Sequence, residues 1–265
     1  MSEFRIIIRK FVPGRILRIV SGLFYGWHGN YASWEEASVK CSGYDATAIL
    51  EKVMKSALMV KSGQAAYERD SFLFGSVQYS WPLLSSLMWI AAQNKGKLHV
   101  LDFGGSLGST YFQNRKFLDL LPEVNWSVVE QPGFVKGGKE HFEDDRLHFF
   151  STIDAACKSA TISVALFSSV LQYLEEPFLF LNQIRSCGIK YLIIDRTPFI
   201  AGADRITIQK VNPRIYKGSY PCRFFNKQKF ISTLAPYYDL VLEFDALDKA
   251  NIKSEFKGFL FSMKK

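Results

Sequence analysis

Histidine and cysteine are scarce in this 265-residue chain, which has four of each. The cysteines are Cys41, Cys157, Cys187 and Cys222, and no two of them have the C-x-x-C spacing typical of zinc sites and redox motifs. The sequence therefore predicts no metal site and no disulfide framework. Scattered cysteines of this kind favour reduced thiols in a cytoplasmic protein.

An apolar run long enough to span a bilayer is also missing, because the apolar helix predicted over 83–92 is too short. The amino-terminal segment, residues 4–24, is apolar but is interrupted by positive charge. Its basic residues before position 21 are Arg5, Arg9, Lys10, Arg15 and Arg18. This pattern excludes a signal peptide. Two interpretations remain open: peripheral contact with an anionic membrane surface, or a terminal helix packed on the domain or on a partner chain.

A glycine-rich turn is the most informative motif that is present. Residues 98–108 read LHVLDFGGSLG, an apolar strand that ends at Asp102 and enters a turn with three glycines. Glycine lets a backbone turn sharply and approach a ligand closely. A second apolar strand, 126–129, is followed by another acid, Glu130. Strand, glycine turn, helix, strand and acid are typical of a nucleotide-binding βαβ unit.

The same turn also spells G-x-S-x-G around Ser106, the nucleophile motif of α/β-hydrolases. A serine hydrolase needs a histidine base later in the chain, after the acid of the triad. The histidines are His28, His99, His141 and His148. None lies where that fold places its base, so hydrolysis through Ser106 stays an alternative with little support. The dehydrogenase fingerprint G-x-G-x-x-G is not matched either.

The motif resembles that of the class I S-adenosylmethionine-dependent methyltransferases, an apolar strand and an acid followed by x-Gly-x-Gly-x-Gly. Asp102, Gly104 and Gly108 match this motif, while Ser106 replaces the middle glycine. Glu130 matches the acid that binds the ribose hydroxyls of the cofactor in that family. The resemblance implies S-adenosylmethionine as cofactor and methyl transfer as activity.

The resemblance covers residues 96–265, with the family's fourth strand at 162–167 and its fifth at 191–195. A narrower similarity is to methyltransferases encoded among polysaccharide-biosynthesis genes. It rests on four segments: Gly43-Tyr44-Asp45, Tyr67-Glu68-Arg69-Asp70, Leu101-Asp102-Phe103-Gly104-Gly105 and Asp195-Arg196-Thr197-Pro198. This subgroup implies an acceptor in surface polysaccharide biosynthesis, with a sugar hydroxyl as the methylated group.

Individual roles follow from the resemblance. The implied cofactor-binding residues are Asp102, Gly104, Gly105, Ser106, Gly108, Glu130, Gln131, Ser151 and Ser168. The candidate catalytic residues on the acceptor side are Asp195, Tyr173 and Arg196. Many relatives carry an acid where Ser151 stands. Arg69 and Asp70, and Trp27 and His28, are further candidates for a cap over the site, although each is equally explained by packing or surface pairing.

The predicted fold class is α/β: a Rossmann-like, mostly parallel seven-stranded sheet with a terminal antiparallel hairpin and a helical amino-terminal extension. The expected divisions are a basic amphipathic arm (1–30), a helical cap (31–95) and the cofactor-binding domain (96–265). Helical spacing of apolar residues after position 45 predicts one cap helix, and Asn226 is expected to cap a later helix. Strands at 239–244 and 256–263 form the expected hairpin.

Net charge is +8. A run of basic residues extends from Arg205 to Lys229, and no acidic residue occurs between Arg205 and Tyr238. Such a run is either a solvated surface or a lip that attracts a phosphorylated substrate. Nucleic acid is not expected, since no binding motif accompanies the charge. The predicted partner is a small-molecule or lipid-linked glycan acceptor. A non-catalytic, membrane-associated scaffold with a cofactor fold is the remaining alternative, and the sequence does not predict an oligomeric state.

Overall fold

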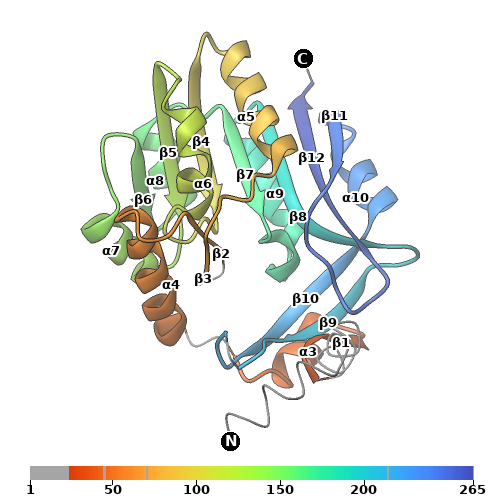
Figure 1. Ribbon diagram of the computed structural model, residues 1–265. Coiled ribbons are helices and arrows are strands. Elements are labelled where there is room, and N and C mark those ends of the chain that lie inside the picture. Colours follow the sequence, from red (N-terminus) through yellow and green to blue (C-terminus); the bar gives the residue numbers. More distant parts are fainter. Residues whose placement is uncertain (1–23, 44–45, 70, 214, 265) are drawn as a thin grey trace, which may run out of the picture.

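The computed structural model describes residues 24–43, 46–69, 71–213 and 215–264, so residues 1–23 of the predicted arm (1–30) lie outside them. Five parallel strands form the centre of the molecule, in the spatial order β6-β5-β4-β7-β8 (Figure 1). Their bounds are β4 Lys97–Phe103, β5 Glu123–Val129, β6 Leu147–Phe150, β7 Val164–Ser168 and β8 Tyr191–Ile200. The order places β4 beside both β5 and β7, so their carboxyl ends meet at one edge.

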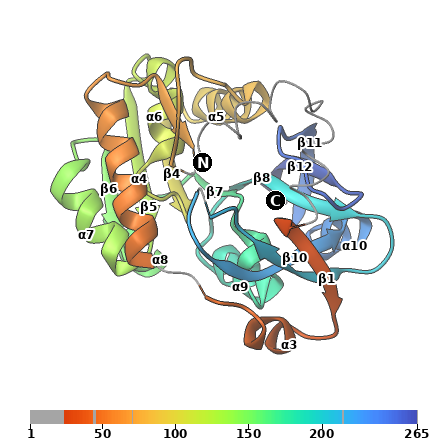
Figure 2. The same cartoon turned by 60° about the horizontal axis from the view of Figure 1, so that its bottom comes forward.

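Helices cover both faces of this sheet (Figure 1, Figure 2). Their bounds are α5 Trp81–Gln93, α6 Ser109–Leu118, α7 Pro132–His141, α8 Ile153–Ser159, the 3₁₀ turn η1 Leu171–Tyr173, α9 Pro177–Ser186 and α10 Lys227–Leu234. Successive side chains of a strand point to opposite faces. Accordingly Val100 packs in the cluster that includes residues of α5, α6 and α7, whereas Leu101 packs with residues of α8, α9 and α10.

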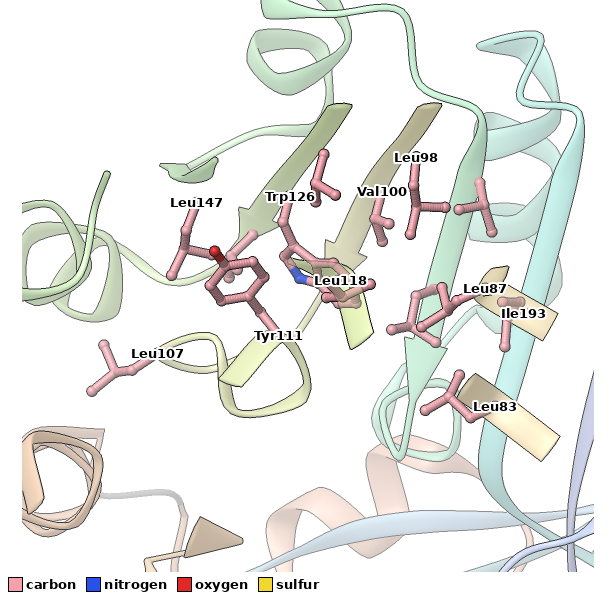
Figure 3. Close-up of a cluster of buried hydrophobic side chains, with 14 of the residues drawn as sticks. Leu83, Leu87, Leu98, Val100, Leu107, Tyr111, Leu118, Trp126, Leu147 and Ile193 are labelled. Carbon is pink, nitrogen blue, oxygen red and sulfur yellow. The ribbon is translucent and has the colours of Figure 1, made fainter. Parts of the chain in front are cut away.

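The first of these clusters is shown in Figure 3, where Leu83 and Leu87 of α5 approach Ile193 of the sheet. Trp126 lies at its centre and is fully buried. An aromatic side chain of this size is among the largest contributors to core stability, because burial stabilises by roughly 25 cal/mol per Å² of apolar surface. The helix α5, which sequence analysis placed in a cap, therefore belongs to the core of the sheet domain.

Two further strands continue the sheet beyond β8. The strands β11 (Tyr238–Asp245) and β12 (Glu255–Met263) pair antiparallel with each other, and β12 pairs antiparallel with β8. The expected strand pair at the carboxyl end is therefore present, one or two residues longer than predicted.

An antiparallel extension was not predicted. The strands β1 (Gly26–Tyr31), β9 (Arg205–Lys210) and β10 (Ser219–Asn226) pair in the order β1-β9-β10, and the end of β10 lies parallel to the end of β8. Within the described residues the sheet thus has ten strands instead of seven. The cause is β8 itself, which runs to Ile200 rather than ending at Asp195 as the sequence suggested, and offers β10 a pairing edge.

The remaining elements lie between β1 and α5. They are α3 Trp34–Val39, α4 Ala46–Lys61, and the two-stranded sheet β2 Tyr67–Arg69 with β3 Phe72–Phe74. The helix α4 is the one that the apolar spacing predicts, and its Ile49, Val53 and Ala57 are buried against the sheet domain. The segment predicted as helical therefore also contains strands.

Candidate functional site

The glycine turn joins β4 to α6 with three residues in the left-handed region of backbone space. Gly104 has φ +73°, Ser106 +55° and Gly108 +87°. A side chain at Gly104 would also be blocked, because a Cβ there would lie 2.8 Å from a methyl group of Val170. Glycine adopts such a conformation without strain, whereas Ser106 adopts it at a cost in free energy. The glycines at positions 104 and 108 therefore suit the turn.

Asp102 ends the buried part of β4, with 1% of its surface exposed. The indole Nε1 of Trp126 donates a hydrogen bond to its Oδ2 at 3.0 Å. Burial raises the pKa of the Asp102 carboxyl to about 7, with the nearby charge of Glu130 acting in the same direction and the Trp126 hydrogen bond opposing it. A buried carboxylate with this cost of ionisation favours a cationic ligand.

Glu130 follows β5 and reaches back to the glycine turn. Its Oε1 accepts a hydrogen bond from the backbone N–H of Ser106 at 3.3 Å, and its Oε2 accepts one from the N–H of Gln131 at 2.8 Å. Burial nevertheless raises the pKa of Glu130 above its ordinary value. Carboxylate oxygens held in this way can accept further hydrogen bonds from paired hydroxyls.

Both acids border a cavity of about 610 Å³ at the carboxyl end of the parallel strands. This volume lies within the range of small-molecule sites. Of the predicted residues, those that line it are Asp102, Gly104, Gly105, Ser106, Glu130, Gln131, Ser168, Tyr173, Asp195 and Arg196. The fold therefore brings together side chains and turns that lie far apart in the sequence.

Gly108 and Ser151 are not among the residues that line the cavity, so cofactor contact by either of them stays a prediction. Gly108 begins α6, and a Cβ there would lie 3.1 Å from Leu147, so its lack of a side chain serves helix packing. Ser151 is exposed. It follows β6, the outermost of the parallel strands.

The acceptor-side candidates lie on β8 and on the turn after β7. Asp195 is 2% exposed; its Oδ2 accepts from the Ser168 hydroxyl at 3.5 Å, while its Oδ1 has no hydrogen-bond partner. Arg196 has φ +52° and forms two hydrogen bonds with Asp248, from Nε at 3.0 Å and from an η nitrogen at 2.9 Å. The Arg196–Asp248 pair thus stabilises β8 at Arg196, where the backbone is strained.

Much of the opposite wall was not predicted from the sequence. Glu68 of β2 is 3% exposed, accepts a hydrogen bond from the Ser109 hydroxyl of α6, and lines the cavity beside Arg69. Its segment contributed to the family resemblance, but nothing local indicated that it would reach the glycine turn. The other prominent polar or aromatic lining residues not predicted are Tyr67, Gln78, Gln113, Gln209, Tyr216, Tyr220, Asp248 and Lys249.

Two residues predicted to cap the site separate in the structure. Trp27 lines the cavity, and its indole Nε1 donates to the Cys222 sulfur at 3.2 Å. His28, the next residue of β1, does not line it. Arg69 lines the cavity, while Asp70 lies outside the described residues.

The hydrolase alternative lacks its histidine base in this site, since none of the described lining residues is a histidine. His99 is held instead at the amino-terminal end of the parallel strands, between the Thr161 carbonyl and Glu123. Ser106 therefore has no activating partner of the kind that a serine nucleophile needs.

The basic run is largely committed to internal contacts. Arg205 donates to the Gly29 carbonyl, and Arg223 donates to the Glu175 carbonyl. Lys227 and Lys229 pair with carboxylates, those of Glu243 and Asp204. These contacts of the basic side chains stabilise the antiparallel extension and α10, so the positive charges at these four positions have a structural role.

Among the described residues no cluster of histidine, cysteine and acidic side chains has the arrangement of a metal site. The described part of the chain also has no helix whose length and apolar character suit a membrane crossing.

Comparisons with known proteins place the fold. No family model and no curated protein matches the sequence. Among solved structures, the N-terminal domain of EvdMO1, crystallised in the presence of SAH and D-fucose, has a TM-score of 0.50 and 9% identity, covering 79% of this chain and 97% of that chain. The fold is Rossmann-like. The S-adenosylhomocysteine-bound 1,6-didemethyltoxoflavin-N1-methyltransferase of Burkholderia thailandensis has a TM-score of 0.45 and 13% identity, covering 91% of this chain and 94% of that chain.

A third structure, an S-adenosylmethionine-dependent methyltransferase from Clostridium acetobutylicum, has a TM-score of 0.46 and 9% identity, covering 69% of this chain and 91% of that chain. The structural neighbours thus include S-adenosylmethionine-dependent methyltransferases. At such low identity the likeness concerns the fold, so chemistry must be argued from the cavity.

Proposed function

We propose that this protein is an S-adenosylmethionine-dependent methyltransferase that acts on a small-molecule acceptor. The observation that carries the proposal is the meeting of Asp102, the glycine turn and Glu130 at one wall of the cavity. Two buried acids suit a ligand that carries an ammonium group, a sulfonium group and a ribose diol. The neighbours crystallised with this cofactor or its analogues agree with the proposal.

The residues divide the task between them. Glu130 accepts hydrogen bonds from the ribose hydroxyls, Asp102 offers negative charge toward the methionine part, and the backbone at Gly104 and Gly105 passes beneath it. Gln131 and Ser168 complete this half. When bound, the cofactor supplies a methyl group activated by its sulfonium charge. The protein then contributes alignment and exclusion of water.

The acceptor occupies the half of the cavity that contains Tyr173, Asp195 and Arg196. We propose a hydroxylated acceptor, a free or lipid-linked sugar of surface polysaccharide biosynthesis, with transfer to oxygen. A lipid-linked acceptor agrees with a basic amino-terminal arm (residues 4–24) that contacts the inner face of the membrane from the cytoplasm. Lys249 also lines the cavity, and a phosphate on the acceptor is compatible with its charge.

Calorimetry tests the cofactor assignment directly. The purified full-length protein is titrated with S-adenosylmethionine, with S-adenosylhomocysteine and with NAD. Saturable binding of the first two and none of NAD is the expected result. Binding of NAD alone, or of none of the three by a protein with a cooperative thermal transition, contradicts the proposal.

A further inference from the structure

Asp195 lines the cavity and carries a buried carboxylate oxygen that no described group of the protein engages. The side chain is 2% exposed, and its Oδ1 has no hydrogen-bond partner. Leaving a charged oxygen buried and unpaired costs free energy that a bound donor recovers. Because Asp195 lines the cavity on the β8 side, a ligand in the acceptor half can supply the missing donor.

The two neighbouring candidates are already engaged. Arg196 is neutralised by its paired hydrogen bonds to Asp248. The Tyr173 hydroxyl donates a hydrogen bond to Gln209 Oε1 at 2.7 Å, so it carries its proton. A protonated phenol and a guanidinium are very weak bases, and of these three side chains the carboxylate of Asp195 is the one that can accept a proton.

We propose that Asp195 is the general base of this site and that the acceptor atom is a hydroxyl oxygen. The inference rests on the proposed function. The acceptor O–H proton moves to Asp195 Oδ1 as the oxygen forms a bond to the methyl carbon. The bond between that carbon and sulfur breaks, and its electron pair stays on sulfur, which leaves S-adenosylhomocysteine. The proton then leaves Asp195 to solvent with the methyl ether product.

The surrounding wall fits a hydroxylated ring compound. Tyr173 and Tyr220 are in edge-to-face contact with ring centroids 5.3 Å apart, and the Tyr220 and Tyr216 hydroxyls share a hydrogen bond of 2.8 Å. Together with Gln209 they line the cavity with flat apolar faces and with hydrogen-bonding groups. Such a mixture fixes the orientation of a polar ring while excluding water.

The electrostatic setting is appropriate for a base. Burial raises the pKa of Asp195 to about 6; the charge of Asp248 adds to the rise, and the charge of Arg196 and the Ser168 hydroxyl oppose it. Lys257 of the neighbouring β12 is hydrogen-bonded to Asp245, and the titratable Tyr173 and Lys249 also face the cavity. A carboxyl with this pKa is ionised at neutral pH and remains able to take a proton.

The test combines binding, titration and turnover in Asp195→Asn. Asp239→Asn, an exposed aspartate on β11, is the matched control. Calorimetry with S-adenosylhomocysteine comes first. If the wild-type protein does not bind this ligand, the proposed function itself is refuted. If both variants bind it as the wild type does, the later measurements test the role of Asp195 alone.

Next, the full chain labelled with ¹³C at aspartate carboxyls is titrated by NMR in its S-adenosylhomocysteine complex. The resonance that Asp195→Asn removes identifies Asp195. A midpoint near pH 6 is expected. A carboxyl that stays protonated up to pH 8.5, or stays ionised down to pH 4.5, overturns the assignment, since the first cannot accept a proton and the second is held by a permanent partner.

Turnover is measured with methyl-labelled S-adenosylmethionine, D-fucose and other free monosaccharides, and the corresponding aminosugars. Transfer to a hydroxyl is expected, with kcat in Asp195→Asn reduced by about 10²- to 10⁴-fold and unchanged in Asp239→Asn. Transfer to the amino group, or an Asp195→Asn variant of wild-type activity, overturns the inference. If no sugar accepts a methyl group, the NMR titration alone decides.

Discussion

Gly105 lies directly against the carboxylate of Asp102, and a Cβ added to Gly105 would come within 2.5 Å of both Cγ and Oδ2 of that side chain. The closeness links the turn to the buried acid. A side chain at position 105 therefore cannot be accommodated unless Asp102 moves. The first prediction follows from this contact.

Gly105→Ala should displace Asp102 and weaken S-adenosylhomocysteine binding, because the added methyl group overlaps a buried carboxylate that has little room to move. Overpacking of this kind costs about 1–3 kcal/mol of stability. Chemical denaturation and calorimetry measure the two effects. Gly75→Ala is the control, since a Cβ there meets nothing within 4 Å. Equal binding by the two variants would contradict the predicted contact.

Glu130→Gln should leave the fold intact and weaken S-adenosylhomocysteine binding. Hydrogen bonds to a charged group contribute roughly 1.5–3 kcal/mol, which corresponds to about a ten- to hundredfold change in Kd. Glu123→Gln changes the same residue type at the other end of β5, where Glu123 pairs with Lys97 and His99. Calorimetry should find normal affinity in that control. Normal affinity in Glu130→Gln would remove Glu130 from the ribose site.

Asp102→Asn should become more stable relative to the wild type as pH rises. The pKa of Asp102 is about 7 in the folded protein against 3.8 for the free group. Between these values the folded protein keeps a proton that the unfolded chain has lost, so the free energy of unfolding of the wild type falls with rising pH. Asparagine does not ionise, and the variant avoids this loss of up to about 4 kcal/mol.

Urea denaturation at pH 4, 6 and 8 measures the difference in stability between Asp102→Asn and wild type. Asp145→Asn, at an exposed position, should show no such trend. A constant difference for Asp102→Asn across this range would mean that Asp102 is ionised in the folded protein at all three pH values.

Arg196→Gln and Asp248→Asn should move the pKa of Asp195 in opposite directions. The Arg196 charge lowers that pKa and the Asp248 charge raises it. Removing the arginine therefore raises the pKa, and removing the aspartate lowers it. NMR titration of the labelled Asp195 carboxyl measures both shifts. Shifts of the same sign would show that rearrangement of the side chains, rather than charge, dominates.

Deleting residues 2–20 should abolish co-sedimentation with anionic vesicles while preserving S-adenosylhomocysteine binding. Each basic side chain near an anionic bilayer contributes about 1 kcal/mol, and five lie in this segment. A full-length protein that ignores such vesicles at low salt, or a truncated one that unfolds, would show that the arm is a structural element instead.

The predictable parts of this fold are those specified by short stretches of sequence. Helical spacing of Ile49, Val53 and Ala57 predicted α4, and Asn226 does cap α10, where its Oδ1 accepts from the Lys229 N–H at 2.7 Å. The glycine turn is likewise local, because positive φ and close contacts demand glycine at Gly104. In each case the residues that determine the structure are neighbours in the chain.

The antiparallel extension could not be predicted in the same way. Its strand β9 pairs with β1, and Ile208 lies opposite His28, which is 180 residues away. The basic residues of β9 and β10 look like a solvated connection until their partners, such as the Gly29 carbonyl for Arg205, are in place. The part of the cavity wall that contains Gln209 and Tyr220 depends on this pairing, so these two residues gave no signal in the sequence.

The length of β8 has a consequence for how ligands enter. This strand pairs with β7 along its first half and with β10 at its end, so the strands on the proposed cofactor side and on the proposed acceptor side of the cavity belong to one hydrogen-bonded sheet. An outward movement of β10 would break its backbone hydrogen bonds to β8. The β2–β3 sheet carries no such bond to the main sheet, and its Glu68 and Arg69 face the same cavity. Movement on the β2–β3 side leaves the ten-stranded sheet unbroken, so we expect ligands to enter and leave the cavity past that side.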